Sequence, residues 1–326
     1  MRAITVPAFG DADVLTPTDV DVPQPGPGEV TVDVAAAAVG LVDVLFRRGD
    51  LADITPLPFT PGIEVAGRIR AVGPDVEGRT VGQMVVTLSR PSGGGYAEVA
   101  LASTHATVPL ARPDGSDLEP TVAVATVPNT VAALATLRDA GRVAADDRLL
   151  VLGAAGGLAG VFPGVARSLG VSRVVGVVSD GARVDDARAL GFDDVVLTAD
   201  LADHTERYDV VVDPVGGGLR ERGLDLLAPL GRLLVVGNAS GADDQLVGAN
   251  RLWLANAGVV GLNVGGLLAA EPDRAAPLAR AAVELVASAE VRVPVTILPL
   301  GRAAEAHRLL ETRSVTGKIV LDPAAG

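Results

Sequence analysis

Apolar and polar residues alternate in several short segments of the first 115 residues. Residues 29–34 read Glu-Val-Thr-Val-Asp-Val, and residues 65–73 and 81–88 have the same texture. A period of two is typical of a strand with one buried face. Clusters of glycine, proline and serine at 23–28 and 92–95 predict turns between such strands. The pattern therefore predicts a β-rich region that extends to about residue 115.

From about residue 118 the pattern changes to strands that alternate with helices. The apolar run 149–152 is typical of a buried strand, and three segments rich in valine and leucine predict further strands: 173–178, 208–213 and 231–237. Helical patterns occur around them at 122–137, 158–169, 183–190 and 219–227. This alternation predicts a parallel, doubly wound sheet with crossover helices. Beyond residue 262 we expect a helix at 275–289 and short strands at 293–298 and 318–321.

The predicted strand 149–152 leads directly into a glycine-rich turn. Its spacing, Gly153-x-x-Gly156-x-x-Ala159, differs from the common G-x-G-x-x-G, and such a turn alone is a weak signal. Where a strand, such a turn and a helix follow one another, backbone N–H groups can bind a pyrophosphate. Pro163 and Gly164 interrupt the helical pattern, and proline inside a helix costs ~3 kcal/mol. Either the helix begins late, or it is kinked close to where a cofactor phosphate would bind, which would weaken or alter that binding.

The composition limits the possible classes of function. The 326 residues, 48% hydrophobic and 21% charged, are enough for two globular domains. A net charge of −13 disfavours nucleic acids and anionic membranes as partners. No continuous apolar run of about eighteen residues predicts a membrane span. The first residues have the pattern of a strand and not of a signal peptide, so we expect a cytoplasmic protein. The chain has no cysteine for a disulfide or a metal thiolate, and its three scattered histidines are expected to be ordinary surface or boundary residues.

Seven short segments have the order and approximate spacing found in one superfamily of dehydrogenases: 43–49, 58–67, 94–98, 153–160, 213–217, 231–237 and 317–321. Together they make the chain resemble the medium-chain dehydrogenase/reductase superfamily, in its zinc-independent quinone oxidoreductase and enoyl reductase branch. The resemblance implies an α/β fold with two domains. A GroES-like β-rich domain, residues 1–117 and 262–326, would join a Rossmann domain with a doubly wound parallel sheet, residues 118–261. The active site would lie in the cleft between them.

Two positions argue against a zinc enzyme. In zinc-dependent relatives a cysteine ligand stands at the position of Gly40, and a histidine ligand stands at the position of Ile63. Neither side chain of this chain can bind a metal, and the cysteine-rich loop of the structural zinc site is absent. We therefore expect no metal, and a zinc alcohol dehydrogenase is the least favoured alternative.

The resemblance implies a nicotinamide cofactor that supplies a hydride. Ser179 and Arg183 follow the second strand of the Rossmann pattern, where NADP-dependent relatives hold the 2′-phosphate. NADPH is favoured over NADH because Ser179 precedes Asp180, so that the strand does not end in an acidic residue. Arg183 could equally be a solvated helix residue. The other residues implied to contact the cofactor are Thr130, Gly153, Ala154, Gly156, Gly157, Leu158, Asn238, Ala239 and Ser240.

The expected reaction is hydride transfer from NADPH to an α,β-unsaturated carbonyl or a quinone. The candidates that could face the cleft are Asp43, Asp50, Glu64 and Asn263. Asp43 could instead cap the helix that follows it, and Glu64 could instead form a structural ion pair with Arg47 or Arg48. No residue is a convincing general acid, so the proton could come from solvent.

Departures from the family keep a second function open. Relatives have an asparagine at the position of Gly40 and a tyrosine near Asp50, and this chain has neither. Tyr96 matches a structural position and is expected to be packed. The alternative function is that of a non-redox descendant, which would bind, isomerise or cyclise a small apolar molecule in the same cleft. Family members are often homodimers joined through an edge strand, which residues 256–265 could supply.

Overall fold

The computed structural model describes residues 1–88, 94–112 and 114–325. Contacts within the chain divide it into two compact units. Unit 1 comprises Met1–Pro128, Ala275–Ala287 and Pro294–Gly326, and unit 2 comprises Asn129–Arg274 and Ser288–Val293. The bounds of the two functional domains expected from the sequence, 1–117 with 262–326 and 118–261, stay a prediction. The turn expected at 92–95 lies partly outside the described residues.

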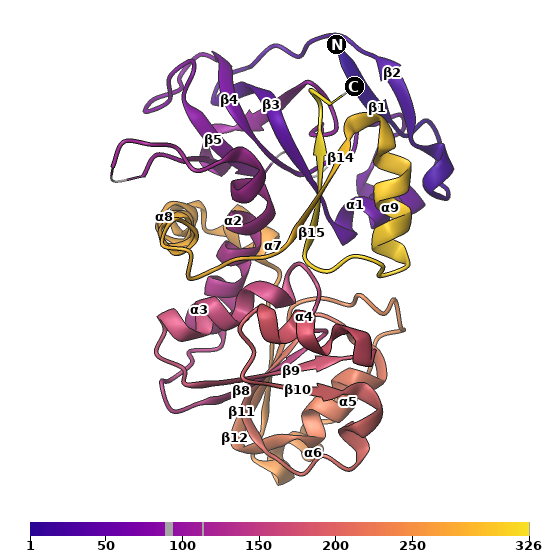
Figure 1. The fold of residues 1–326 in the computed structure, drawn as a ribbon, viewed down its shortest axis with the longest axis vertical. Coiled ribbons are helices and arrows are strands. Elements are labelled where there is room, and N and C mark those ends of the chain that lie inside the picture. Colours follow the sequence, from indigo (N-terminus) through magenta and orange to yellow (C-terminus); the bar gives the residue numbers. More distant parts are fainter. Residues whose placement is uncertain (89–93, 113, 326) are drawn as a thin grey trace. The chain divides into compact units, whose positions relative to one another are not determined.

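Unit 1 is built on a mixed sheet of seven strands, which runs in the order β14-β15-β3-β4-β5-β7 with β6 also paired to β3 (Figure 1). The strands are β3 (Glu29–Val39), β4 (Glu64–Val72), β5 (Met84–Leu88), β6 (Val99–Ser103), β7 (Thr107–Pro109), β14 (Val295–Pro299) and β15 (Lys318–Asp322). A separate antiparallel pair joins β1 (Arg2–Thr5) to β2 (Thr16–Asp19). The β-rich region predicted for the first 115 residues is confirmed, and β14 and β15 from the end of the chain complete its sheet.

Strand β3 is the centre of this sheet. It pairs antiparallel with β4, β6 and β15, and its register to β4 shifts twice, between Thr31 and Val32 and between Val34 and Ala36. Only Asp33 and Ala35 of β3 are exposed, and every residue from Ala36 to Val39 is buried. The last part of the strand is therefore covered on both faces.

Helices of unit 1 cover the sheet with apolar faces. They are α1 (Leu41–Arg48), the first part of α2 (Pro120–Leu134), α8 (Ala275–Ala287) and α9 (Ala303–Glu311). One hydrophobic cluster of unit 1 combines Ile4, Val65 and Phe46 with Leu298, Leu300 and Ile319, so both ends of the chain contribute to one core. Short 3-10 turns lie at Ala12–Val14, Ala52–Ile54, Thr104–Ala106 and Leu300–Arg302.

Unit 2 contains a parallel sheet of six strands in the order β10-β9-β8-β11-β12-β13. The strands are β8 (Arg148–Leu152), β9 (Arg173–Val178), β10 (Asp194–Leu197), β11 (Tyr208–Asp213), β12 (Leu227–Val235) and β13 (Gly258–Gly261). Numbered from β8, the order is 3-2-1-4-5-6, which is the Rossmann arrangement, and its switch point lies between β8 and β11. The doubly wound prediction is confirmed, and the apolar runs that predicted β8, β9 and β11 are almost wholly buried.

The helices of unit 2 lie on both faces of this sheet. Figure 1 shows α3 and α4 on one side of the strands, with α5 and α6 toward the other. Their bounds are α3 (Phe162–Ser168), α4 (Val184–Ala189), α5 (Gly217–Asp225), α6 (Ala249–Ala255) and α7 (Val264–Ala270). Short 3-10 turns lie at Ala159–Val161, Gly181–Arg183, Thr198–Ala202 and Pro272–Arg274.

The interrupted helix after the glycine turn begins late. A 3-10 turn over Ala159–Val161 precedes α3, which places Pro163 in the first turn of the α-helix, where its missing N–H has no partner to lose. A Cβ at Gly164 would lie 2.2 Å from the carbonyl oxygen of Glu290. Gly164 therefore permits close packing of α3 on residues 288–293, and neither residue kinks the helix.

Helix α2 continues into a π-helical stretch, Ala135–Ala140. Over Pro120–Ala140 this is a described helix that is long and apolar enough to cross a membrane. About two-thirds of its most apolar part is buried inside the protein, as in a core helix. The cytoplasmic location expected from the sequence stays a prediction.

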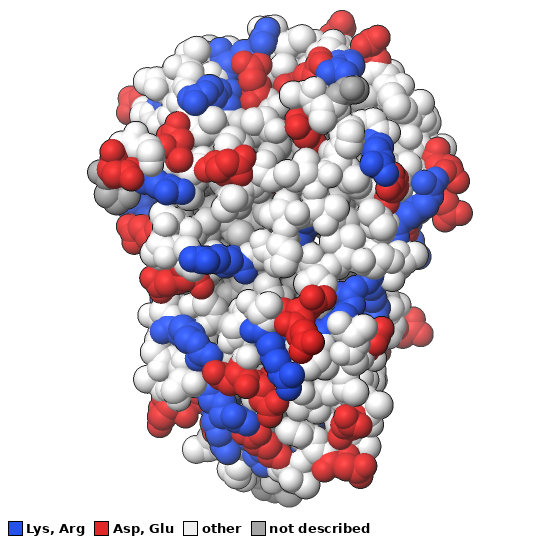
Figure 2. All heavy atoms as spheres, viewed as in Figure 1, with Lys and Arg blue, Asp and Glu red and all other residues white. Residues whose placement is uncertain are grey.

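Acidic and basic side chains are interspersed on the face that Figure 2 shows. Most of the ion pairs between described residues are at least partly solvated, such as Arg2 with Glu98 and Arg70 with Asp33. Exposed pairs of this kind contribute little, typically ~0 to 1 kcal/mol each. The pairs with energetic weight are the buried ones described below.

Candidate functional site

The glycine-rich turn starts at the carboxyl end of β8, at the switch point of the parallel sheet. Gly153 has a φ of 70°, and a Cβ there would lie 2.9 Å from Cγ2 of Val215. Glycine thus allows both a left-handed backbone and a close approach to the loop after β11. The N–H of Ala154 donates to the carbonyl of Val177 at 2.9 Å, which ties the turn to the end of β9.

The middle of the turn leaves backbone donors free. Gly156 is exposed, and a Cβ there would meet only the carbonyl oxygen of Gly153, at 3.3 Å. The N–H groups of Gly157 and Leu158 donate to no other described residue. Unpaired N–H groups beside a backbone without side chains are what a pyrophosphate requires. The turn therefore fits the phosphates of a dinucleotide.

A buried ion pair shapes the loops at the carboxyl ends of β11 and β12. Asp213 is fully buried, and its carboxylate accepts from Nε of Arg220 at 2.6 Å. It also accepts from the N–H groups of Val215 at 2.9 Å and Gly216 at 2.7 Å. Arg220 in turn donates from Nη2 to the carbonyl of Gly237 at 2.9 Å. One carboxylate thus fixes both loops that follow the switch point.

Ala239 and Ser240 lie on the loop after β12, directly beside the loop after β11. Their N–H groups donate to the carbonyls of Pro214 at 3.0 Å and Val215 at 2.8 Å. Because Val215 also packs against Gly153, the structure brings the loop of Asn238, Ala239 and Ser240 to the same edge of the sheet as the glycine turn. The sequence placed these segments together only through the family resemblance.

Asn238 is held in place by its own loop. Its Nδ2 donates to the carbonyl of Ala242 at 2.7 Å, and the hydroxyl of Ser240 donates to its Oδ1 at 3.1 Å. Gly216 has a φ of 77°, and a Cβ there would lie 2.2 Å from Oδ1 of Asn238. The loop after β11 therefore needs glycine at this point to leave room for the asparagine.

Ser179 and Arg183 lie beyond the carboxyl end of β9. Asp180 accepts from the N–H of Ala182 at 2.9 Å and so caps the 3-10 turn Gly181–Arg183. Ser179 is exposed and Arg183 is half-buried. The guanidinium of Arg183 makes no hydrogen bond or ion pair with another described residue, which leaves its five N–H donors available to an anion.

Two further candidate residues, Thr130 and Asn263, lie in a helix and at the start of a helix. Thr130 is fully buried in α2. Asn263 is exposed and caps α7, where its Oδ1 accepts from the N–H of Gly266 at 3.2 Å. Asn263 follows β13 by two residues and thus belongs to unit 2, whereas Asp43, Asp50 and Glu64 belong to unit 1.

Asp43 is the third residue of α1 and 1% exposed. Its Oδ2 accepts from the N–H of Gly40 at 2.9 Å, and its Oδ1 accepts from the N–H of Gly62 at 3.1 Å. Asp43 thus supports the start of α1 as the third residue of a capping box, and not from a position before the helix, as the sequence indicated. Burial raises the pKa of this carboxyl to about 6, the Gly40 hydrogen bond lowers it, and Glu64 raises it further by charge repulsion.

Glu64 forms an ion pair, but the predicted partner was wrong. Its Oε2 lies 2.7 Å from Nζ of Lys318, the only lysine of the chain, and both side chains are nearly buried. Strands β4 and β15 both pair with β3, which brings the two residues together across the sheet. Arg47 instead forms a two-bond pair with Glu311, at 2.6 and 3.2 Å, because α9 packs beside α1.

Asp50 lies on the surface. Its carboxylate is 3.6 Å from Nε of Arg48, and the two side chains are 47% and 52% exposed. The structure gives it no buried partner among the described residues. Of the acidic candidates in unit 1, only Asp43 and Glu64 lie close enough to influence one another.

A buried histidine was missed as a functional candidate. His307 is 0% exposed on α9, and its Nε2 lies 3.1 Å from the hydroxyl of Tyr96, which in turn donates to Oδ2 of Asp43 at 3.4 Å. Burial and the nearby Arg47 lower the pKa of His307 to about 3. The signal was present in the sequence, since Ala303, Ala306 and His307 fall on one face of a helix, but α9 itself was not predicted.

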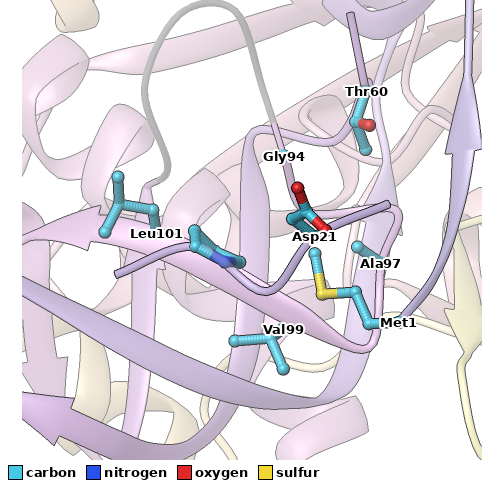
Figure 3. Close-up of a pocket in the computed structure, with 8 residues that line it drawn as sticks. Met1, Asp21, Thr60, Gly94, Ala97, Val99 and Leu101 are labelled. Carbon is cyan, nitrogen blue, oxygen red and sulfur yellow. The ribbon is translucent and has the colours of Figure 1, made fainter. Parts of the chain in front are cut away.

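A small surface pocket lies elsewhere in unit 1, and Figure 3 shows it. It has a volume of about 190 Å³ and is lined by Met1, Asp21, Pro23, Thr60, Gly94, Ala97, Val99 and Leu101. Its wall is mainly apolar, and Asp21 is the one charged side chain among its lining residues. None of the candidate catalytic or cofactor-binding residues predicted from the sequence lines it.

Comparisons with known proteins identify the family of this chain. Residues 26–112 match the alcohol dehydrogenase GroES-like domain, and residues 190–321 match the zinc-binding dehydrogenase family. The quinone oxidoreductase of Pseudomonas aeruginosa is 31% identical over 334 residues, which cover 99% of this chain and 99% of that protein. This chain belongs to the quinone oxidoreductase branch of the medium-chain dehydrogenase/reductase superfamily.

Solved members of this branch have the same fold. A mycobacterial protein in complex with NADPH superposes with a TM-score of 0.89 at 29% identity, covering 99% of this chain and 100% of that one. The Escherichia coli quinone oxidoreductase in complex with NADPH superposes with a TM-score of 0.88 at 25% identity, again over 99% and 100% of the two chains. The resemblance stated from the sequence is confirmed.

Gly40 stands at one of the two positions where the zinc-dependent relatives are expected to have a ligand. Gly40 has an ordinary extended backbone, with φ −114° and ψ 159°. A Cβ there would meet its nearest neighbour, Oδ2 of Asp43, at 3.5 Å. The fold therefore tolerates a side chain at Gly40, and the absence of a metal-binding group there is a property of this sequence.

Proposed function

We propose that this chain is an NADPH-dependent reductase that transfers a hydride to a quinone or an α,β-unsaturated carbonyl without a zinc ion. The observation that carries the proposal is the glycine turn with free N–H groups at the switch point of a 3-2-1-4-5-6 sheet. This turn occurs in a chain of the quinone oxidoreductase branch, two members of which are known in complex with NADPH.

The cofactor would be held by residues of unit 2. The N–H groups of Gly157 and Leu158 suit the pyrophosphate, and the loop of Asn238, Ala239 and Ser240 lies on the same edge of the sheet for the nicotinamide end. When bound, NADPH supplies the hydride. The protein contributes binding and orientation, and the Asp213–Arg220 pair supports this by fixing the loops after β11 and β12.

The choice of NADPH over NADH rests on the end of β9. Arg183 has no partner among the described side chains, and a guanidinium is well suited to a phosphate. The carboxylate of Asp180, which would repel a 2′-phosphate, is engaged in capping the turn Gly181–Arg183. Both features support recognition of the 2′-phosphate by Ser179 and Arg183.

The proposal of zinc independence rests on residue types. Glycine and isoleucine at positions 40 and 63 have no atom that binds zinc. A reductase of this kind must then stabilise the negative charge that develops on the acceptor oxygen with hydrogen-bond donors, each worth roughly 3 kcal/mol in comparable oxyanion sites. The proton would come from solvent, because Asp43 and Glu64 are already engaged with partners inside unit 1.

We further propose that the protein is a homodimer joined through β13. This strand is at the edge of the sheet, within the segment 256–265 expected for it, and among the described strands it pairs with β12 alone. Leu246, Trp253 and Leu254 nearby in the chain are 98%, 74% and 74% exposed. A second copy that adds its own β13 would satisfy the unpaired edge. Light scattering should show a dimer that Trp253→Arg weakens, and Val81→Arg, at a 64% exposed site of unit 1, serves as the control.

The non-redox alternative receives no support from the structure. Its motives were Gly40, the scarcity of polar side chains in the matched segments, and the proline inside the helix after the glycine turn. The last motive is removed, because Pro163 lies in the first turn of α3, where it is tolerated. The relatives reported above are quinone oxidoreductases or were solved with NADPH. Redox chemistry is therefore the function that the site supports best.

A direct assay tests the proposal. The purified protein is mixed with NADPH or NADH and a panel of quinones and enones, and the loss of nicotinamide absorbance is followed with and without a metal chelator. We expect turnover of at least one acceptor, faster with NADPH and unchanged by the chelator. Silence over the whole panel together with no NADPH binding by calorimetry would overturn the proposal, and loss of activity with the chelator would overturn zinc independence.

A further inference from the structure

Three buried side chains of unit 1 form a continuous hydrogen-bonded chain that the proposed reaction does not use. Asp43 lies on α1, Tyr96 precedes β6, and His307 lies on α9. Each is at most 1% exposed. The hydroxyl of Tyr96 is 3.4 Å from Oδ2 of Asp43 and 3.1 Å from Nε2 of His307. The three residues come from distant parts of the sequence, and the fold alone brings them together.

The hydroxyl of Tyr96 has a single proton, so it can donate to only one of its two neighbours. When Asp43 is ionised, Tyr96 donates to the carboxylate, and His307 must donate its Nε2–H to the tyrosine oxygen. When Asp43 is protonated, its own O–H can donate to the tyrosine oxygen. Tyr96 then donates to Nε2 of His307, whose proton moves to Nδ1. The two arrangements differ by one proton, and every hydrogen bond in the chain changes direction.

The charged groups around the chain are suited to such a reversal. Asp43 faces Glu64 on β4 and Lys318 on β15, and His307 faces Arg47 on α1, which is itself paired with Glu311 on α9. Because burial and Arg47 hold the pKa of His307 at about 3, its imidazole stays neutral near pH 6. The histidine can therefore respond to Asp43 by changing tautomer without becoming a cation.

The second nitrogen of His307 is free to take part. Nδ1 is buried and has no hydrogen-bond partner among the described residues. Nδ1 can therefore be unprotonated or protonated, and no hydrogen bond of the protein is lost in either state.

We propose that Asp43, Tyr96 and His307 form a reversible proton-positioning chain, in which protonation of Asp43 switches neutral His307 from its Nε2–H to its Nδ1–H tautomer. The consequence lies at the two backbone segments that Asp43 holds. An ionised carboxylate binds the N–H groups of Gly40 and Gly62 more strongly than a neutral one does. The hold on these segments is therefore expected to weaken as Asp43 gains a proton. This inference concerns unit 1 alone and does not depend on the proposed reduction.

The experiment is nitrogen NMR of the full-length protein with ¹⁵N-labelled histidine, recorded from pH 5 to pH 8. The chain has only three histidines, and the ring-nitrogen signals of His307 are identified as those lost in His307→Gln. Protonation of Asp43 is followed in parallel by the infrared band of a protonated carboxyl that Asp43→Asn removes. Tyr96→Phe keeps the aromatic ring but removes the hydroxyl. His204→Gln is the matched control, because His204 also contacts a tyrosine hydroxyl, that of Tyr208 at 2.8 Å, but in unit 2.

We expect the His307 signals to change from the Nε2–H pattern to the Nδ1–H pattern over the pH range in which the Asp43 band appears. In Tyr96→Phe this coupling should disappear, and in His204→Gln it should remain. A His307 tautomer that stays constant while Asp43 titrates would overturn the proposal. So would a His307 that becomes a cation in this range, or a tautomer change that persists in Tyr96→Phe. If Tyr96→Phe does not fold, the wild-type pH series alone still decides between the first two outcomes.

Discussion

Nε of Arg220 lies 2.6 Å from the buried carboxylate of Asp213, and Nη2 of the same guanidinium reaches the carbonyl of Gly237 at 2.9 Å. The two residues thus join α5, the end of β11 and the end of β12 through one charged contact. Because the loops they fix lie beside the glycine turn, this ion pair supports both the stability of unit 2 and the cofactor site.

Removal of one partner of this pair should be costly. We expect Arg220→Met to destabilise the protein by ~3 to 5 kcal/mol, because it leaves a buried, uncompensated carboxylate. The double variant Arg220→Met with Asp213→Asn should recover part of the loss, since the buried charge is gone. Urea unfolding measures both. If the single variant loses less than about 1 kcal/mol, the pair is not the constraint that we describe.

Arg183 should determine the preference for NADPH. Arg183→Ala is expected to weaken NADPH binding by roughly 10- to 100-fold, the range for a charged hydrogen bond of ~1.5 to 3 kcal/mol, and to leave NADH binding unchanged. Calorimetry with both nucleotides checks this. Arg188→Ala is the matched control, because Arg188 lies on α4 but is exposed near Asp185. Equal losses for the two nucleotides would show that Arg183 does not bind the 2′-phosphate.

Gly164 should tolerate no side chain. A Cβ would lie 2.2 Å from the carbonyl oxygen of Glu290, so Gly164→Ala must push α3 away from residues 288–293, and we expect a loss of ~1 to 3 kcal/mol. Gly218 is also helical, but a Cβ there meets nothing within 4 Å. Gly218→Ala should therefore be neutral or stabilise by up to ~1 kcal/mol. Thermal unfolding of the two variants gives the comparison, and equal effects would contradict the packing described for α3.

Asp43 and His307 should have opposite effects on stability as the pH falls. The raised pKa of Asp43, about 6 against 3.8, means that the folded protein takes up a proton before the unfolded chain does, so acidification through pH 6 stabilises the fold. The lowered pKa of His307, about 3 against 6.5, means that the unfolded chain takes up its proton first, so acidification below pH 6.5 destabilises the fold. Each contribution amounts to ~2 to 3 kcal/mol at pH 4.5.

The two contributions separate in single variants. Relative to the wild type, His307→Gln should gain stability between pH 7 and pH 4.5, and Asp43→Asn should lose it. Urea unfolding at a series of pH values measures the differences, in which the other titrating groups cancel. The same pH slope in both variants would contradict the pKa shifts assigned to these residues.

Much of the fold could be predicted from the pattern of the sequence. The strands at β9 and β11 were predicted with their observed ends, because each is a short segment rich in valine in the middle of a parallel sheet. Strand β10 was missed, and β13 was expected only as an edge strand somewhere in 256–265; both lie at the edges of that sheet, where half-buried residues give no clear pattern. Helix α9 was missed because alanines occupy much of its buried face.

The site could be predicted only in part, and the reason is physical. The glycine turn is contiguous in the sequence, so its position after β8 could be deduced. The ion pairs of Glu64 with Lys318 and of Arg47 with Glu311 join residues more than 200 positions apart, and the register of β15 and the packing of α9 determine them. No local pattern encodes such partners, which is why Glu64 was assigned to Arg47 or Arg48 and not to Lys318.

The central claim is hydride transfer from NADPH, and a stereospecific isotope measurement tests it most directly. NADPH is prepared with deuterium at one or the other face of the reacting carbon and oxidised by the protein with an excess of the best quinone or enone acceptor. The mass of the product NADP⁺ is then measured. We predict that deuterium is lost from one labelled form and fully retained from the other. Loss of the same share of deuterium from both forms, or no oxidation of NADPH with any acceptor, would contradict the account.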